Sequence, residues 1–229
     1  MSNPALGYRI TEKFLARELL ALGEAEFARE HLGIGGSARA PAVIDADTWA
    51  SLIDDRSRID GGVVVAVDIP PDRSGTSISV AGHRKDGRGH VELVDRRSGT
   101  SWAVERLVEL DVRHSPKAVV LDPAGPAGSL ITELQEAGIE PVLVSGRELA
   151  QACGMFYDAA TQGMLRHLNQ PELNVAVDGA RKRNLGDAWA WHRRDASVDI
   201  SPLVSATLAL HGAGKPSERR QKSGKAVFI

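Results

Sequence analysis

Residues 61–97 read GGVVVAVDIPPDRSGTSISVAGHRKDGRGHVELVDRR, and the pattern in this stretch decides the fold. Its opening, GGVVVAVDI, is a run of small and β-branched apolar residues, which predicts a strand buried on both faces. SGTSISVAGHR alternates as a strand does, a glycine-rich turn follows at residues 85–89, and HVELVDRR is the next strand. Three strands joined by short turns predict an antiparallel meander.

Helical and strand patterns alternate after this meander. The elements expected next are a helix at residues 101–112, capped by Thr100 or Ser101, a strand at 118–122 (AVVLD), a helix at 128–137, a strand at 140–144 (EPVLV), a long helix at 147–168 and a final helix at 201–211. Three antiparallel strands followed by alternating helix and strand predict an α/β domain, with a mixed sheet flanked by helices. This order of elements is similar to that of the ribonuclease H-like fold.

The composition indicates one substantial domain with appendages. Residues 1–60 are predicted to be an N-terminal helical linker, because residues 11–32 carry apolar side chains at the spacing of an amphipathic helix. Residues 61–212 form the expected α/β domain, and residues 213–229 are expected to be a basic, flexible tail. Hydrophobic residues make up 42% of the chain, but no apolar run approaches the roughly 18 residues that span a bilayer, so no membrane association is expected. The single cysteine, Cys153, excludes an internal disulfide and fits a reducing compartment.

Two aspartates end buried strands and are the first candidates for chemistry. Asp68 ends VVVAVD, and Asp122 ends AVVLD. Ligands of open α/β sheets gather beyond the carboxyl ends of the strands, so the two carboxylates meet if these strands are neighbours, as strands one and four are in the ribonuclease H-like topology. A divalent metal would compensate the loss of hydration of both groups. The alternative for Asp68 is that it simply opens the turn IPPD.

A third carboxylate is expected from the region before the last helix. Asp199 is the first choice, Asp195 and Asp187 are its rivals, and the alternative is that Asp199 only caps the helix. Three carboxylates can hold two hard cations, which activate a water and stabilise the leaving oxygen in phosphodiester hydrolysis. Oxygen ligands favour Mg²⁺ or Mn²⁺ over zinc, and His167 is a possible auxiliary residue with a structural role as the alternative.

A local basic face accompanies these acids, although the net charge is −2. The residues expected to bind the DNA phosphate backbone, with little base readout, are Arg181, Lys182, Arg183, Arg193 and Arg194.

Taken together, these segments resemble the large terminase subunit of tailed phages, and in particular its C-terminal nuclease domain. The segments that carry the resemblance are, in chain order, NPALGYRI and EFAREHLG (residues 3–10 and 26–33), VVVAVDIPPDRSGTSISVAG (63–82), AVVLDPAGPAGSLITEL (118–134), QACGMFYDAATQGMLRHLNQPELNVAV (151–177) and GDAWAWHRRDASVDISPLVSATLAL (186–210). The resemblance implies that Asp68, Asp122 and Asp199 are the first, second and third metal ligands.

The resemblance also implies a function: cleavage of concatemeric double-stranded phage DNA during genome packaging, in the cytoplasm of the host of a phage or prophage. Expected partners are double-stranded DNA, the portal protein, the small terminase subunit and a separate ATPase domain. This chain shows no ATPase motor, because GAGKPS (residues 212–217) has Ala209 where a phosphate-binding loop requires glycine. Two alternatives stay open: another ribonuclease H-like nuclease (a junction resolvase or a ribonuclease H), or a non-catalytic remnant that binds DNA or a packaging partner.

Overall fold

The computed structural model of the chain describes residues 42–194 and 198–215. The helix expected at residues 11–32, the candidate ligand Asp195 and residues 216–229 of the expected tail lie outside the described residues. No described helix is both long and apolar enough to cross a lipid bilayer.

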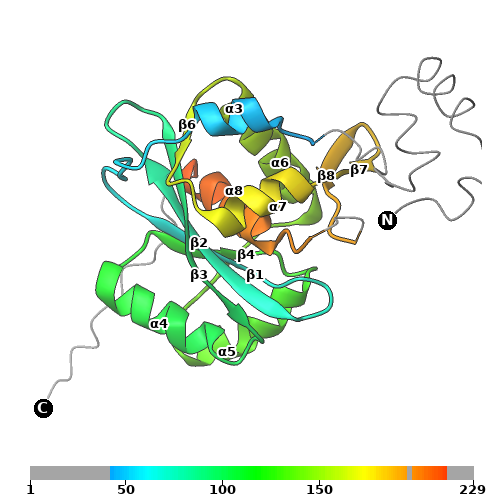
Figure 1. Ribbon diagram of the computed structural model, residues 1–229. Coiled ribbons are helices and arrows are strands. Elements are labelled where there is room, and N and C mark those ends of the chain that lie inside the picture. Colours follow the sequence, from blue (N-terminus) through cyan, green and yellow to red (C-terminus); the bar gives the residue numbers. More distant parts are fainter. Residues whose placement is uncertain (1–41, 195–197, 216–229) are drawn as a thin grey trace, which may run out of the picture. The chain divides into compact units, whose positions relative to one another are not determined.

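A six-stranded mixed sheet lies at the centre of the described unit (Figure 1). Its strands, in order across the sheet, are β5 (Val142–Leu143), β4 (Ala118–Leu121), β1 (Val64–Asp68), β2 (Gly75–His83), β3 (Gly89–Ser98) and β6 (Leu165–His167). The β1–β2–β3 meander is antiparallel, as predicted. β4 runs parallel to β1, β5 parallel to β4, and β6 parallel to β3. The predicted mixed sheet is therefore confirmed.

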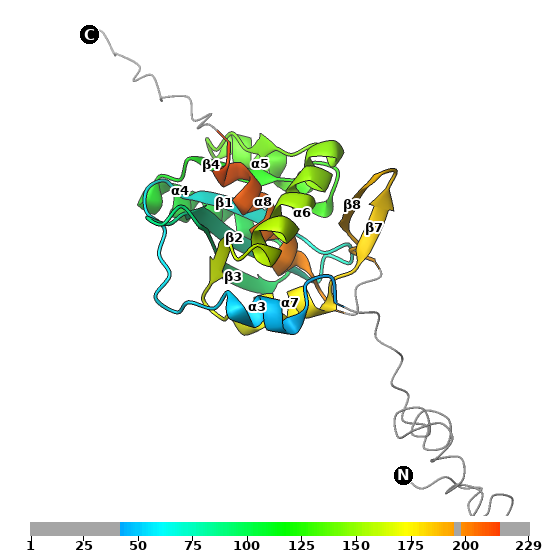
Figure 2. The same cartoon turned by 90° about the horizontal axis from the view of Figure 1, so that it is seen from above.

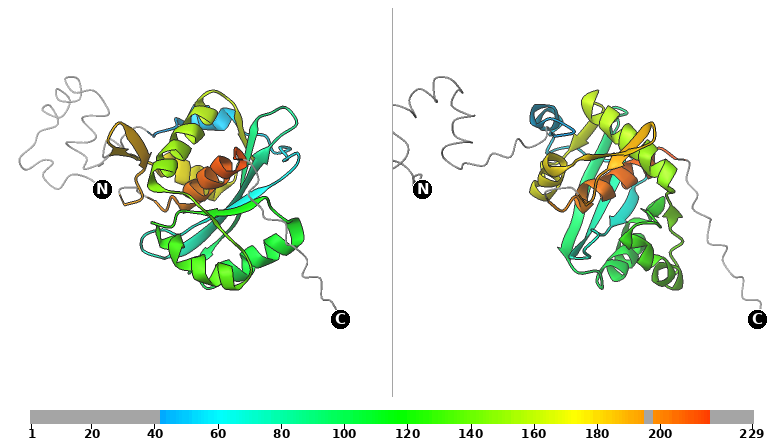
Figure 3. Two further views of the ribbon diagram at one scale, coloured as in Figure 1. Left: turned by 180° about the vertical axis from the view of Figure 1, so that it is seen from behind. Right: turned by 90° about the vertical axis from the view of Figure 1, so that its right-hand side faces the viewer.

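Helices cover both faces of this sheet (Figures 1 and 3). One face carries α4 (Ala103–His114), the 3₁₀ helix η1 (Pro126–Leu130) and α5 (Ile131–Glu136), and the other carries α3 (Ala46–Ser51), α6 (Gly146–Thr161), α7 (Pro171–Gly179) and α8 (Ser201–Ala213). Alternate residues of β1 contact opposite layers: Val65 and Val67 belong to the core cluster of α4 and α5, and Val64 and Ala66 to that of α8. This two-sided burial explains the uninterrupted apolar run of β1.

Helix α8 is the central helix of its layer and is buried on nearly all sides. An apolar surface all round is the pattern of a helix enclosed by other elements. Two of its serines make hydrogen bonds with β2: Ser201 Oγ lies 2.8 Å from Ser77 Oγ, and Ser205 Oγ lies 2.7 Å from Ser79 Oγ. These two contacts fix the start of α8 against β2, and with it the position of Asp199.

A two-stranded hairpin, β7 (Lys182–Leu185) and β8 (Ala188–Trp191), lies beside α6 (Figure 2). Aromatic contacts hold it there, since the ring centroids of Tyr157 and Trp189 are 6.0 Å apart and those of Phe156 and Trp191 are 6.2 Å apart. The sequence analysis did not predict this hairpin, nor helix α7. The basic run 181–194 is therefore partly a β-hairpin.

Several predicted boundaries were wrong. The long helix expected at residues 147–168 ends at Thr161, because Gly163 adopts a left-handed conformation (φ 70°) that stops a helix, and Leu165–His167 then pairs with β3. Helix α4 begins at Ala103, and no side chain caps it. Strand β5 contains only Val142–Leu143, and α8 continues past His211 to Ala213.

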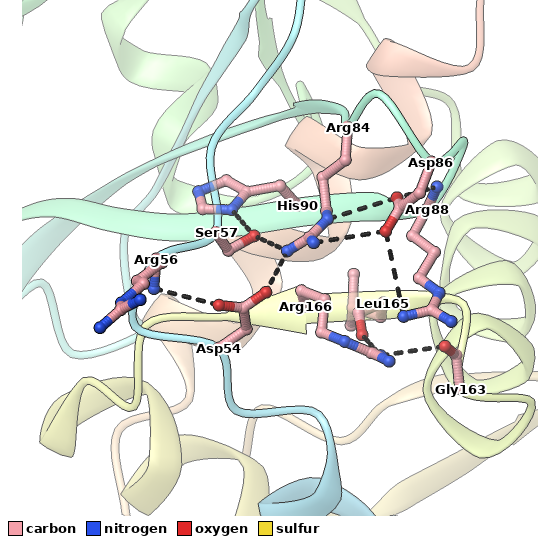
Figure 4. A network of polar contacts seen from close by, with 10 residues as sticks. All are labelled: Asp54, Arg56, Ser57, Arg84, Asp86, Arg88, His90, Gly163, Leu165 and Arg166. Carbon is pink, nitrogen blue, oxygen red and sulfur yellow. Dashed lines mark hydrogen bonds and ion pairs between the residues drawn. The ribbon is translucent and has the colours of Figure 1, made fainter.

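Residues 42–60, which the sequence analysis placed in the linker, pack into the described unit, which begins at Ala42. Trp49 and Leu52 are buried in the core beside α6 and α8. A polar network joins the following residues to the β2–β3 hairpin (Figure 4): Arg84 Nη1 donates to Asp54 Oδ2 (2.6 Å) and to Ser57 Oγ (2.7 Å). A stretch with three glycines and a proline, GIGGSARAP (residues 33–41), lies directly before this boundary, which the sequence analysis had placed at residue 60.

Candidate metal centre and nucleic-acid groove

The side chains of Asp68 and Asp122 lie at the same edge of the sheet. In the parallel β1–β4 pair, Ala66 lies opposite Val120, so two residues further along each strand Asp68 and Asp122 are level with one another. Both carboxylates face the guanidinium of Arg193: Nη1 lies 2.8 Å from Asp68 Oδ1, and Nη2 lies 3.4 Å from Asp122 Oδ2. The structure therefore brings these two predicted residues together, and Arg193 bridges them.

Asp68 is in an unusual environment for an acid. The residue is 1% exposed, and neither carboxylate oxygen has an aligned hydrogen-bond donor, although Arg193 is within ion-pair distance. The pKa of Asp68 is raised to about 7: burial is the largest cause, the nearby carboxylates of Asp122 and Asp199 also raise it, and Arg193 opposes the increase. A buried carboxylate is costly unless a cation compensates it, and in this structure the guanidinium of Arg193 is that cation. The oxygens of Asp68 therefore fit a hard divalent cation.

Asp199 lies two residues before the first residue of α8, Ser201. Its Oδ1 accepts a hydrogen bond from the Ser201 amide (2.8 Å), and its Oδ2 accepts one from Ser201 Oγ (3.0 Å) and pairs with Arg96 Nη2 (3.0 Å). Asp199 thus binds the first residue of the helix, although the N-cap position itself is Ile200 and no side chain caps it. It also lines, together with Asp68 and Arg193, a small cavity of about 20 Å³. The same side chain therefore contacts the start of α8 and lines the cavity of the candidate centre.

Arg193 lines both a small cavity and a larger groove. It lines the small cavity that holds Asp68 and Asp199, and also a larger groove that holds Asp122. Within the described residues, no three acidic, histidine or cysteine side chains are already arranged to hold a metal ion. A cation bound by both Asp68 and Asp122 has to replace the guanidinium, because Arg193 occupies the position between them.

This competition leads to a prediction for Arg193→Ala. Removing the guanidinium leaves the carboxylates of Asp68 and Asp122 free for a metal, so we expect Mn²⁺ to bind about tenfold more tightly, a change of about 1.4 kcal/mol. Isothermal titration calorimetry with Mn²⁺ in the absence of DNA measures it. Arg58→Ala, an exposed arginine before β1, serves as the control and should leave Mn²⁺ affinity unchanged. Weaker Mn²⁺ binding by Arg193→Ala would contradict the competition.

The larger groove is rich in arginine. It has a volume of about 1270 Å³ and runs between the N-terminal part of α6, the β7–β8 hairpin and the loop that follows β4. Its charged lining residues are Asp122, Arg147, Arg183, Arg193 and Arg194. Four arginines facing one acid give the groove a positive potential, which attracts a phosphate backbone.

Comparison with solved structures shows which fold this is. The HK97 bacteriophage large terminase superimposes with a TM-score of 0.63 at 17% identity, covering 92% of this chain and 52% of that protein. The large terminase nuclease of thermophilic phage G20c with bound magnesium gives 0.55 at 18% identity, over 75% of this chain and 97% of that domain. The nuclease domain of the Thermus phage P74-26 large terminase gives 0.52 at 15% identity, over 74% and 94%. The fold is that of a large terminase nuclease domain.

The predicted ribonuclease H-like architecture is thereby confirmed. No protein-family model matches the chain, and no curated protein matches it in sequence. The chain spans about half of the HK97 protein, 52% of its length. The likeness therefore establishes the terminase-nuclease fold, and the chemistry has to be argued from the residues themselves.

Not all of the predicted basic residues line the groove of this terminase-nuclease fold. Arg183, Arg193 and Arg194 do. Arg181 Nη1 instead donates to the backbone carbonyl of Ala180 (2.7 Å), and Lys182 Nζ lies 4.5 Å from the ring centroids of Tyr157 and Trp189. Arg183 lines the groove and Lys182 does not, because successive side chains of the strand β7 point to opposite faces.

The two auxiliary candidates that the structure describes, His167 and Asp187, lie in different places. His167 is fully buried in β6, at the opposite edge of the sheet from β4, and stacks on Trp49 with ring centroids 3.9 Å apart. Its Nε2 contacts the Trp49 carbonyl (3.0 Å), and its Nδ1 accepts a hydrogen bond from the Asn169 amide (3.2 Å). Both ring nitrogens are therefore engaged by backbone groups inside the core. Asp187 is exposed at the turn of the β7–β8 hairpin, and Asp195 lies outside the described residues.

Sequence reasoning missed one of the charged residues that line the groove, Arg147. The capping box of Ser145 and Glu148 marks the start of α6, so the helix position was open to prediction. Nothing in the local sequence links Arg147 to the basic run that follows 34 residues later, at Arg181. Only the packing of α6 beside the hairpin puts these arginines around one groove.

Proposed function

We propose that this domain is a divalent-metal-dependent endonuclease that cuts concatemeric double-stranded phage DNA during genome packaging. One observation carries the proposal: Asp68 and Asp122, at the tips of neighbouring parallel strands, share the guanidinium of Arg193, which also lines the arginine-rich groove. Structures of the fold's relatives support the use of divalent ions, since the G20c nuclease has been solved with magnesium and with cobalt, and that of bacterial virus Sf6 with manganese.

In this proposal Asp68, Asp122 and Asp199 hold two Mg²⁺ or Mn²⁺ ions. When bound, such ions activate a water and stabilise the leaving oxygen of a phosphodiester. The carboxylates of Asp68 and Asp122 supply hard oxygen ligands, and Asp199 turns toward the same centre from the start of α8. Arg183 and Arg194 bind phosphates of the DNA backbone along the groove. They orient the DNA across the carboxyl ends of β1 and β4.

The setting proposed for this activity is that of a terminase. The substrate is double-stranded DNA in the cytoplasm of the host cell, and the partners are the portal protein, the small terminase subunit and an ATPase domain carried elsewhere. The basis for these assignments is the fold shared with large terminases of several phages.

The proposal is tested by incubating the purified chain with supercoiled plasmid and Mn²⁺ or Mg²⁺. We expect nicked and linear DNA, and no cleavage in EDTA. A substrate panel with an RNA–DNA hybrid and a four-way junction is run in parallel, and plasmid should be cut at least as well as either. Strong preference for the hybrid or the junction would reassign the domain to another ribonuclease H-like nuclease. DNA binding without cleavage under any metal condition would make it a non-catalytic binding domain.

A further inference from the structure

We propose that helix α6 forms a second phosphate-binding wall of the groove, with Arg147 as its main contact, so that DNA is held between α6 and the β7–β8 hairpin. This inference rests on the proposed function, because it takes the groove to be the path of the DNA. It adds a binding element that the basic run at residues 181–194 does not contain.

The two walls face one space. Arg147 and Gln151, one helical turn apart on the same face of α6, line the groove together with Arg183 on β7 and Arg194 in the loop after β8. Asp122 lines the same groove, so a strand that lies in it passes the candidate metal centre. Figures 2 and 3 show the hairpin beside α6.

The packing between the walls fixes their separation. Phe156 and Tyr157 of α6 make edge-on ring contacts with Trp191 and Trp189 of β8. Trp191 is buried, and its Nε1 donates to Thr207 Oγ1 of α8 (2.9 Å), which ties the hairpin to the central helix. The wall that carries Arg147 and the wall that carries Arg183 are therefore connected through the core.

Within the described part of the chain, three of the four arginines that line the groove have no acidic partner, and the fourth, Arg193, pairs with Asp68 and Asp122. Several arginines outside the groove pair with acids, namely Arg84–Asp54 (2.6 Å), Arg97–Asp95 (2.8 Å), Arg106–Asp95 (2.6 Å) and Arg113–Glu109 (2.9 Å), whereas Arg181 donates to backbone carbonyls instead. Among the described residues, Arg147, Arg183 and Arg194 have no such partner, and all three are exposed. Unpaired guanidiniums around a groove are the arrangement that binds phosphates.

The acid nearest to Arg147 in the sequence is already engaged. Glu148 Oε1 lies 2.6 Å from Lys215 Nζ, and Glu148 Oε2 accepts a hydrogen bond from the Ser145 amide (2.8 Å). These contacts, with that of Lys215 the largest, lower the pKa of Glu148 to about 2. Glu148 is thus bound to other groups at the start of the helix and does not form an ion pair with Arg147.

Fluorescence anisotropy of the full chain with a labelled duplex, in EDTA so that no cleavage occurs, tests the inference. We expect Arg147→Ala to weaken binding about three- to tenfold and to lower the slope of log Kd against log salt by about one. Arg147→Lys should restore most of the affinity and the slope, because one charge is kept. The matched control is Arg113→Ala, an exposed arginine on α4 at the other face of the sheet, which should bind as the unmodified chain does.

The outcomes separate this inference from the proposed function. If Arg147→Ala binds with unchanged affinity and salt slope while Arg183→Ala binds weakly, the second wall is overturned and the nuclease proposal stands. If the unmodified chain binds no duplex at any salt concentration, the proposed function is overturned and the second wall with it. A loss of affinity on Arg147→Ala with an unchanged thermal unfolding curve supports the inference, because Arg147 is exposed and its removal should not alter the fold.

Discussion

Asp68→Asn and Asp122→Asn should each reduce plasmid cleavage with Mn²⁺ by about a thousandfold, because the loss of one ligand charge removes about 4 kcal/mol of metal-dependent stabilisation. The amide keeps the size of the side chain and removes the charge that a hard cation requires. Both residues lie at the tips of adjacent strands and contact the same guanidinium, so the two variants should fail to a similar degree. Initial rates of plasmid linearisation at saturating Mn²⁺ measure the effect.

Loss of cleavage in these variants should not come from misfolding. In EDTA, Asp68→Asn should unfold at a temperature equal to or above that of the unmodified chain, because the amide removes the desolvation cost of a buried carboxylate and its oxygen can still accept from Arg193. Duplex binding in EDTA should persist in both variants, since the arginines remain. The matched control is Asp55→Asn, at an exposed aspartate before β1, which should cleave normally. Cleavage retained by Asp68→Asn and Asp122→Asn would rule out the assigned centre.

Trp49→Ala should lower the free energy of unfolding by about 3–5 kcal/mol, the usual result of removing a large buried aromatic side chain. Trp49 is 6% exposed, stacks on His167 and lies 6.2 Å from the ring of Phe156. Its Nε1 also donates to Asn174 Oδ1 (2.8 Å), which connects α3 to α7. Urea denaturation followed by circular dichroism measures the change.

The control for Trp49→Ala is Ile53→Ala, four residues along the chain at a side chain that is 38% exposed, which should change stability by less than about 1 kcal/mol. The pair tests whether residues 42–60 belong to the folded unit. If Trp49→Ala is as mild as Ile53→Ala, these residues are an appendage, as the sequence alone indicated, and the core contacts of α3 contribute little.

The sheet and the two strand-tip aspartates could be predicted because their signals are local. A strand buried on both faces has to be apolar throughout, so VVVAV is visible in the sequence, and an acid directly after it is conspicuous. Parallel pairing of the first and fourth strands then places Asp68 and Asp122 at one edge without further information.

The rest of the site depends on contacts between distant residues. The bridge of Arg193 to Asp122 spans 71 positions, and the groove wall that includes Arg147 exists only because aromatic residues pack α6 on the hairpin. His167 and Lys182 have the residue types of functional groups, but ring stacking on Trp49 and cation–π contacts with Tyr157 engage their side chains elsewhere. Residue type alone does not distinguish these two uses.

The most direct test of the central claim, that Asp68 and Asp122 together hold a divalent cation, is a crystal structure of the chain in saturating Mn²⁺ with anomalous diffraction data. We predict an anomalous peak within about 2.3 Å of a carboxylate oxygen of both Asp68 and Asp122, with the Arg193 guanidinium turned out of its bridging position. Manganese found only elsewhere, with Arg193 still bridging the two carboxylates, would contradict the claim.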